Sequence, residues 1–239
     1  MEIHSRDVSI TTPDGAMPAF RCVPATPRSV PAVIVLMEAF GLTSHIREVT
    51  ERVARAGYVA IAPDLFWRDA PNNTFGYDQV PQAIQVMLKL DHERVVADVG
   101  ATLSHVEGMP EVVPSAIGVM GFCMGGGFTF LTACTLSHRI AAAASFYGMV
   151  RDEWIDAVDA ITVPIHLFFG GKDEFIPPDR ISRIESRFAE LHKPCGITVY
   201  PDADHGFFCH ERPSFDEHAA RDSWRTVLAF FAEHLPPPT

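Results

Sequence analysis

The fold is decided by residues 116–127, which read AIGVMGFCMGGG. Ala116–Met120 is an unbroken apolar run, typical of a strand that is buried on both faces of a sheet. Glycines follow at once, and an apolar segment compatible with a helix then extends to about Leu136. The stretch therefore predicts a buried strand, a sharp turn around Cys123 and a helix, which is the repeating unit of an α/β protein.

Similar apolar runs occur on both sides of this stretch, and helix-compatible segments separate them. The expected strands are Ala32–Met37, Tyr58–Ala62, Ala141–Tyr147, Ile165–Phe169 and Ile197–Tyr200. The expected helices are Ser44–Ala56, which Gly57 should end, and Gln79–Leu90, Asp91–Val106, Asp179–Leu191 and Phe215–His234. Such alternation predicts a mostly parallel sheet flanked by helices on both faces.

The N-terminal part predicts an antiparallel hairpin at the edge of this sheet. Val8–Thr12 and Met17–Val23 are strand-like, and the turn sequence Pro13-Asp14-Gly15 joins them. The chain has 239 residues, and roughly 150 residues per domain would allow one large domain or two small ones. It contains no internal repeat and no Ser/Gly-rich linker, so we expect one domain over residues 1–239.

Composition excludes several classes of function. The 19 Lys and Arg residues against 30 Asp and Glu residues give a net charge of −11, which disfavours binding to nucleic acids or anionic lipids. No apolar run reaches the roughly 18 residues of a membrane span, and the N-terminus does not resemble a signal peptide. Five widely spaced cysteines without a Cys-x-x-Cys pair argue against a disulfide framework or a zinc ribbon. We expect a cytoplasmic protein.

Four reactive side chains directly follow expected strands. Glu38 follows Ala32–Met37, Cys123 the strand at residues 116–120, Asp173 that at 165–169 and His205 that at 197–200. Functional groups in parallel sheets collect at the carboxyl ends of the strands, so these four side chains can converge in space.

Residues 121–125 have the form Gly-x-nucleophile-x-Gly, with Cys123 in the centre. A nucleophile on a sharp strand-to-helix turn has a strained backbone, and close neighbours must lack Cβ atoms. The N-terminus of the following helix would favour a reactive thiolate. The competing interpretation is a buried structural cysteine, which is our expectation for Cys134. A dinucleotide-binding Gly-x-Gly-x-x-Gly motif cannot be placed over residues 121–130, and we expect no cofactor.

The order nucleophile, acid, histidine is the order that α/β-hydrolases use. In this interpretation His205 transfers the proton and Asp173 fixes its tautomer and orientation. Asp202 and Asp204 compete with Asp173 for the orienting role. Asp173 could instead cap the helix that begins near Asp179, and His205 could be an ordinary loop residue.

With these residues in place, the sequence resembles the dienelactone hydrolases over some 200 residues, from about Pro31 to the C-terminal helix. The resemblance implies an α/β-hydrolase fold, a Cys123–His205–Asp173 triad and no metal. It also implies that Glu38 hydrogen-bonds the resting thiol and accepts its proton, and that the backbone N–H groups of Met124 and Ala39 form the oxyanion hole. The motifs that carry it are Met37–Gly41, Ala62–Leu65, Gly121–Gly126, Gly170–Asp173 and Asp204–Phe207.

The chain departs from the family where the substrate carboxylate is bound. Dienelactone-cleaving members place one arginine after the segment matching Asp64-Leu65 and another four residues after the histidine. Here no arginine occurs between Arg68 and Arg94, and Cys209 stands four residues after His205. Arg68 and Arg212 are the candidate replacements.

The remaining expectations concern the pocket and its substrate. Phe66 stands where the family often has tyrosine, and a smaller or more apolar ester or lactone is at least as well supported as dienelactone itself. Core packing is the competing explanation for the aromatic residues that are expected to line the pocket. These are Phe40, Trp67, Phe75, Tyr77 and Tyr147.

Three alternatives remain open from the sequence. The same residues could attack a phosphotriester or a thioester, or the chain could be a thiol-based sensor or binding protein without hydrolytic activity. His205, Cys209 and His210 could hold a metal, although Pro201 and Gly206 indicate a loop that does not fix their spacing. We expect a monomer or a small homo-oligomer, and the irregular segment Leu65–Asp78 is a candidate lid.

Overall fold

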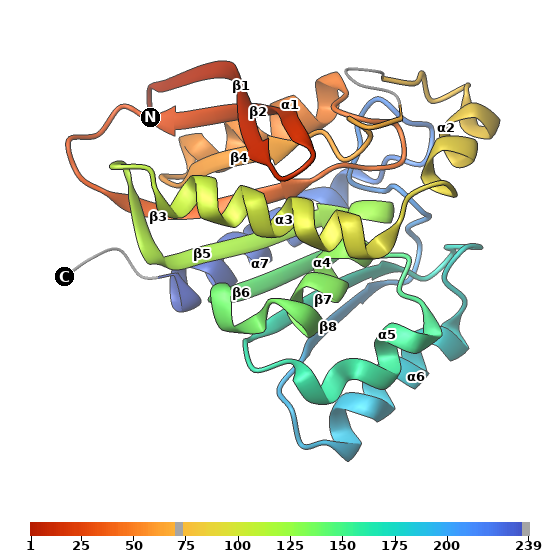
Figure 1. The fold of residues 1–239 in the computed structure, drawn as a ribbon. Helices are drawn as coiled ribbons and strands as arrows, with labels where there is room; N and C mark the ends of the chain where they lie inside the picture. Colours follow the sequence, from red (N-terminus) through yellow and green to blue (C-terminus); the bar gives the residue numbers. More distant parts are fainter. Residues whose placement is uncertain (70–73, 236–239) are drawn as a thin grey trace.

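A central sheet runs through the molecule, with helices on both of its faces (Figure 1). The computed structural model describes residues 1–69 and 74–235. In this part of the chain the sheet has eight strands in the order β1-β2-β4-β3-β5-β6-β7-β8. The strands are β1 (Ile3–Thr12), β2 (Gly15–Pro24), β3 (Val30–Leu36), β4 (Val59–Pro63), β5 (Val112–Phe122), β6 (Ala142–Phe146), β7 (Ile165–Gly170) and β8 (Gly196–Tyr200).

The expected hairpin is confirmed at one edge of the sheet. β1 pairs antiparallel with β2, and β2 pairs antiparallel with β4, whereas β4, β3, β5, β6, β7 and β8 are parallel neighbours. β5 is longer than expected and begins at Val112, because the chain pairs with Val30 of β3 before the apolar run starts.

The helices confirm the alternation expected from the sequence, with one addition. The short helix α5 was not expected, since five residues are too few to show a periodic pattern. The helices are α1 (Ser44–Arg55), α2 (Val80–Met87), α3 (His92–Glu107), α4 (Met124–Thr135), α5 (Asp152–Asp156), α6 (Pro178–Glu190) and α7 (Glu217–His234). Among the described helices, none is long and apolar enough to cross a membrane.

The two faces of the sheet are covered by different helices. α3 and α4 pack against each other on one face, as Figure 1 shows. α1 and α7 cover the other face and are joined there by Arg52, whose guanidinium lies 4.4 Å from the centre of the Trp224 ring. The central strands are buried by both layers, which explains why their sequences are apolar without alternation.

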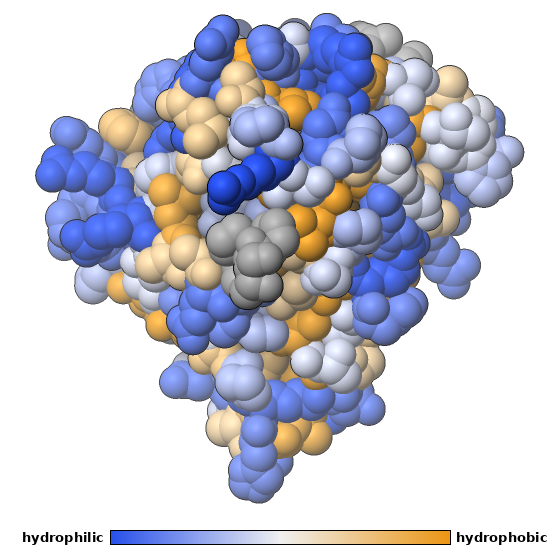
Figure 2. All heavy atoms as spheres, turned by 90° about the vertical axis from the view of Figure 1, so that its left-hand side faces the viewer, coloured by the Kyte–Doolittle hydropathy of each residue, from blue (hydrophilic) through white to orange (hydrophobic). Residues whose placement is uncertain are grey.

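The two ends of the parallel strands differ in character. The N-terminus lies at the end where these strands begin, and this side faces the viewer in Figure 2. Its surface is mainly hydrophilic, with smaller apolar areas between charged side chains. The opposite end, where the parallel strands finish, holds the loops that carry the four reactive side chains.

Candidate active site

Cys123 occupies a strained turn between β5 and α4. Its backbone has φ 54° and ψ −117°, a conformation that non-glycine residues rarely adopt. A Cβ atom on Gly125 would lie 2.4 Å from the carbonyl oxygen of Leu36, and one on Gly121 would lie 2.3 Å from that of Gly125. Only glycine fits at both positions, so the motif serves to bring the strand and helix close enough to hold Cys123 in this turn.

Asp173 and His205 lie beside Cys123, although 50 and 82 residues separate them from it in sequence. The ring Nδ1 of His205 donates to Oδ2 of Asp173 at 2.8 Å, and all three side chains are buried. Burial lowers the pKa of His205, but the charge of Cys123 and the hydrogen bond with Asp173 outweigh it and raise that pKa to about 10. The imidazole is thus placed to exchange a proton with the thiol beside it.

The two competing carboxylates have other partners. Asp202 is exposed and pairs with Lys172 at 2.9 Å. Asp204 accepts a hydrogen bond from the backbone N–H of His205, not from its ring. Of the three candidates, Asp173 is therefore the one that the structure brings to the imidazole.

Glu38 is fully buried and faces a cation and a phenol. Its Oε1 accepts from the hydroxyl of Tyr147 and from Nη1 of Arg212, each at 3.4 Å. Its Oε2 has no hydrogen-bond partner within the described residues. Burial raises the pKa of Glu38, while Arg212, His205 and Tyr147 act to lower it. No hydrogen bond between Glu38 and the Cys123 sulfur occurs in the described structure; the sulfur lies 3.9 Å from Sδ of Met149.

The residues expected to form the oxyanion hole are Met124 and Ala39. Met124 is the first residue of α4, so its N–H is among the donors without a partner inside the helix. Ala39 follows Glu38 after β3 and lines the same cavity as Cys123. Ala39 thus lies at the cavity that contains the thiol, and Met124 is the residue directly after Cys123.

The thiol opens into a cavity of about 120 Å³ with a mostly apolar wall. Val80, Ile84 and Met87 on one face of α2 form part of this wall, at the spacing of successive helical turns. The other lining residues are Ala39, Phe40, Cys123, Met149, Phe175, His205 and Arg212. We refer to this space as the thiol cavity. Phe40 lies where the sequence placed it; Met149, Phe175 and α2 were not anticipated.

Arg212 is the arginine that lines the thiol cavity, and Arg68 is not part of its lining. The guanidinium of Arg212 lies 5.6 Å from the ring centre of Phe40 and 5.8 Å from that of Tyr77. Arg68 instead pairs with Asp98 at 2.5 Å and with Asp14 at 2.8 Å. Because Asp98 is buried on α3 and requires a cation, Arg68 is held outside the cavity.

The aromatic residues expected in the pocket take different places. The indole of Trp67 donates to Asp98 at 3.0 Å and lies away from the thiol cavity. Tyr147 is fully buried, with its ring 5.1 Å from that of His205. The ring of Phe75 packs on Phe66, and the hydroxyl of Tyr77 accepts from the thiol of Cys209 at 3.2 Å. Only Phe40 of this set lines the thiol cavity. Residues 70–73 of the candidate lid lie outside the described residues.

The three residues considered as metal ligands have separate partners. His205 bonds to Asp173, Cys209 to Tyr77, and His210 lies 3.7 Å from Glu48. In the described part of the chain, no group of three or more His, Cys, Asp or Glu side chains is arranged to hold a metal ion.

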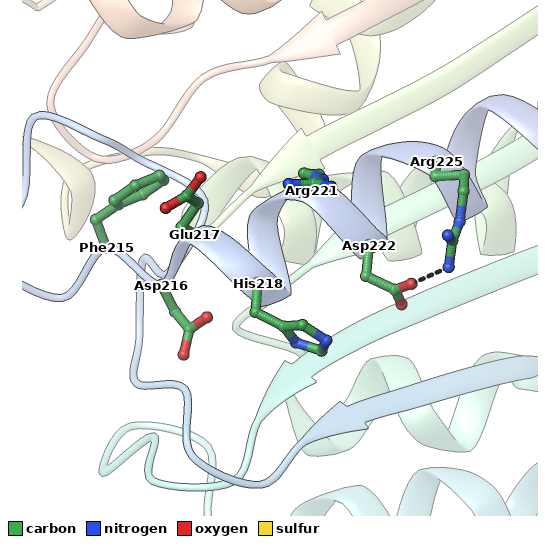
Figure 3. A pocket seen from close by; sticks show the side chains of 7 residues that line it. All are labelled: Phe215, Asp216, Glu217, His218, Arg221, Asp222 and Arg225. Carbon is green, nitrogen blue, oxygen red and sulfur yellow. Dashed lines mark hydrogen bonds and ion pairs between the residues drawn. The ribbon is translucent and has the colours of Figure 1, made fainter.

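A larger hollow, about 860 Å³, lies elsewhere, along the first turns of α7. Figure 3 shows its lining, in which the Asp222 carboxylate points to Arg225 and the other side chains spread outward. It contains charges of both signs but none of the four reactive side chains. The thiol cavity is therefore the site that combines a recess with a nucleophile.

His45 supports the loop that follows His205 and titrates in an unusual range. It is 1% exposed, and neither ring nitrogen has a hydrogen-bond partner in the described structure. Its ring packs against Phe122, Phe208 and His210. Burial, helped by the charges of His210, Arg52 and Arg212, lowers the pKa of His45 to about 3.

This burial predicts a stability that falls on acidification. The unfolded chain protonates His45 near pH 6.5, whereas the folded chain does so near 3. Between these values the unfolded state binds more protons, so the free energy of unfolding decreases by up to about 1.4 kcal/mol per pH unit as pH falls. Urea unfolding of wild type and His45→Phe from pH 7 to 4 measures it. Equal slopes for both proteins would contradict the prediction.

Comparison with known proteins identifies relatives of this chain. A family model described as the dienelactone hydrolase family matches residues 17–235. A Synechocystis sp. protein, provisionally named a carboxymethylenebutenolidase, is 36% identical over 98% of this chain and 99% of the relative. A protein of the same provisional name from Methylorubrum extorquens is 30% identical over 95% of this chain and 80% of the relative.

A solved structure agrees with the sequence matches. The crystal structure of a protein from Klebsiella pneumoniae, provisionally named a dienelactone hydrolase, has a TM-score of 0.91 at 30% identity. It covers 98% of this chain and 100% of that chain. The α/β-hydrolase fold expected from the sequence is thereby confirmed.

Proposed function

This chain belongs to the dienelactone hydrolase family and is a hydrolase of lactones or esters, and we propose that Cys123 is its nucleophile. In this proposal His205 is the base, and Asp173 orients His205. The observation that carries the proposal is the 2.8 Å hydrogen bond between Asp173 and His205, next to a thiol that is held at φ 54° and lines the same cavity as His205. A merely structural cysteine would need neither the strain nor the partners.

The reaction proceeds through a thioester. The sulfur of Cys123 attacks the carbonyl carbon, and its proton resides on His205. The N–H groups of Met124 and Ala39 stabilise the oxyanion, and His205 then gives its proton to the leaving alkoxide, so that the alcohol departs. Water then gives one proton to His205, and its hydroxide attacks the thioester carbonyl. The sulfur leaves as the carboxylic acid is released, and the proton taken from water restores the Cys123–His205 pair.

Glu38 controls the thiol in this proposal. Its Oε2 is unpartnered and available to the resting thiol, and its charge opposes that of a thiolate. Arg212, 3.4 Å from Oε1, offsets this charge. In the resting enzyme the charges of Glu38 and Arg212 thus offset each other, and the thiol stays protonated until substrate enters.

A charge-removing substitution tests this role. In Glu38→Gln the carboxylate is lost, Arg212 is left without its partner, and the thiolate is favoured. We expect the rate of Cys123 alkylation by iodoacetamide at pH 7 to rise about tenfold, with peptide mapping to identify the alkylated residue. The matched control is Glu48→Gln, a change of the same kind in an exposed glutamate that pairs with His210. A Glu38→Gln rate at or below that of wild type would refute the role.

The substrate is expected to be a small, largely apolar ester or lactone. The thiol cavity is mainly apolar, and its cation, Arg212, already faces Glu38. Wild-type kcat/KM should therefore be higher for p-nitrophenyl acetate than for a dienelactone. The reverse preference would show that Arg212 binds the substrate carboxylate. Turnover only of a thioester or a phosphotriester would replace the proposed substrate class, and no turnover of any would favour the thiol sensor.

We also propose where this protein acts and in what form. All five cysteines are free, which supports a reducing, cytoplasmic environment. The negative charge supports a protein that acts on small molecules without binding nucleic acid, as a monomer or small homo-oligomer.

A further inference from the structure

A second recess adjoins the thiol cavity. It has a volume of about 180 Å³ and shares Met87 and Met149 with the thiol cavity, so these two side chains lie between the spaces. The remaining lining residues are Leu88, His92, Met124, Phe128, Arg151 and Trp154. We refer to this space as the aromatic recess. Of this lining, the mechanism derived above uses only the N–H of Met124.

The aromatic recess has the wall of a binding site for an apolar group. The ring centres of His92 and Trp154 are 5.2 Å apart, and those of Phe128 and Trp154 are 5.9 Å apart. The guanidinium of Arg151 pairs with Glu153 at 2.5 Å, and its Nη1 lies 3.5 Å from Nε2 of His92. A cavity of about 150 Å³ with apolar walls holds a benzene ring. The recess is therefore large enough for one ring or a short alkyl chain.

Exposed apolar side chains gather around the same place. Leu88, at the end of α2, is 75% exposed, and Phe175, which lines the thiol cavity, is 62% exposed. Val80, at the start of α2, is 39% exposed. Large apolar side chains at a surface are costly unless a ligand covers them, and here they flank the nucleophile.

The chemistry determines which half of a substrate each space receives. His205 must protonate the leaving oxygen, so the alcohol lies on the side of His205. His205 lines the thiol cavity but not the aromatic recess. The recess is lined instead by Met124, whose N–H is the proposed donor to the oxyanion. The acyl substituent on the carbonyl carbon therefore extends toward the aromatic recess.

We propose that the aromatic recess is the acyl-binding subsite of this enzyme, and that it selects esters, or lactones, with an aryl or short alkyl substituent on the carbonyl side. This inference rests on the proposed function, because it requires attack by Cys123. It assigns the alcohol to the thiol cavity between Val80 and Phe175.

The test is an acyl series with a constant leaving group. For wild type, kcat/KM for p-nitrophenyl acetate, butyrate and hexanoate should rise by roughly fourfold for each methylene that enters the recess, until it is full. In Leu88→Trp, which places an indole at the mouth, the hexanoate-to-acetate ratio should fall at least tenfold. In Trp154→Ala, which enlarges the recess, the optimum should move to a longer chain.

Val80→Trp is the matched control, because it makes the same change on the thiol cavity at the other end of α2. Val80→Trp should lower kcat/KM for acetate esters of large alcohols more than kcat/KM for ethyl acetate. The ratio of kcat/KM for hexanoate to that for acetate should stay as in wild type. Both Leu88 and Val80 are exposed, and thermal unfolding verifies that each variant folds.

Two results would overturn the inference without affecting the proposed function. One is Cys123-dependent turnover of acetate with no increase along the wild-type acyl series. The other is a dependence of kcat/KM on acyl length that neither Leu88→Trp nor Trp154→Ala changes, including the case in which only Val80→Trp changes it. Failure of the proposed function would be distinct, since acetate itself would then not be turned over through Cys123.

Discussion

Cys123→Ala should lower kcat/KM for p-nitrophenyl acetate by at least about 10⁴-fold, while the protein remains folded. The proposed mechanism passes through a bond to this sulfur, and neither His205 nor the oxyanion donors can replace it. The loss corresponds to about 5.4 kcal/mol of transition-state stabilisation. Steady-state kinetics measure the effect, and trapping of the acyl-enzyme by mass spectrometry should place the acyl group on Cys123 in wild type.

The control is Cys134→Ala, on the helix that Cys123 begins. Cys134 is buried, its thiol lies 3.6 Å from the carbonyl oxygen of Trp154, and burial raises its pKa to about 12. We expect full activity from this variant and no acylation at Cys134. Turnover by Cys123→Ala within tenfold of wild type would remove the nucleophile from the proposal.

The sequence was sufficient to predict the fold and the edge of the sheet at which the reactive residues gather, because the signals for both lie in short stretches of the chain. The apolar run before Gly121 and the glycines around Cys123 specify a buried strand and a tight turn, and both signals lie within a dozen residues. Parallel strands then bring their carboxyl ends to one edge. Glu38, Asp173 and His205 lie at the same edge as Cys123 because each follows its own strand.

The residues that line the site were harder to predict from the sequence, because the partner of each side chain determines whether it points into the cavity. Arg68 and Arg212 look alike in sequence, yet Asp98 holds one outside the site and Glu38 holds the other within it. Both carboxylates come from distant segments, so no spacing rule could separate the two arginines. The apolar face of α2 carries a helical signal, but its period cannot show whether the face meets a core or a cavity.

Asp173→Asn is expected to reduce kcat/KM by about 10⁴-fold, because the structure fixes which way the new amide must turn. Oδ1 of Asp173 accepts from the backbone N–H groups of Phe175 at 2.8 Å and Ile176 at 3.1 Å. The amide oxygen must stay there, since an NH₂ group would oppose two donors. The NH₂ then faces Nδ1 of His205, where the carboxylate now accepts.

An amide donor at Nδ1 forces the wrong tautomer on His205, with its proton on Nε2, so the ring cannot accept the proton of Cys123. The turn at residues 173–176 keeps its hydrogen bonds, and Tm should change by only a few degrees. The control is Asp202→Asn, an exposed carboxylate paired with Lys172, which should retain wild-type kcat/KM. If Asp173→Asn kept its activity and Asp204→Asn lost it, the orienting role would pass to Asp204. A large fall in Tm for Asp173→Asn would instead make this residue a structural cap.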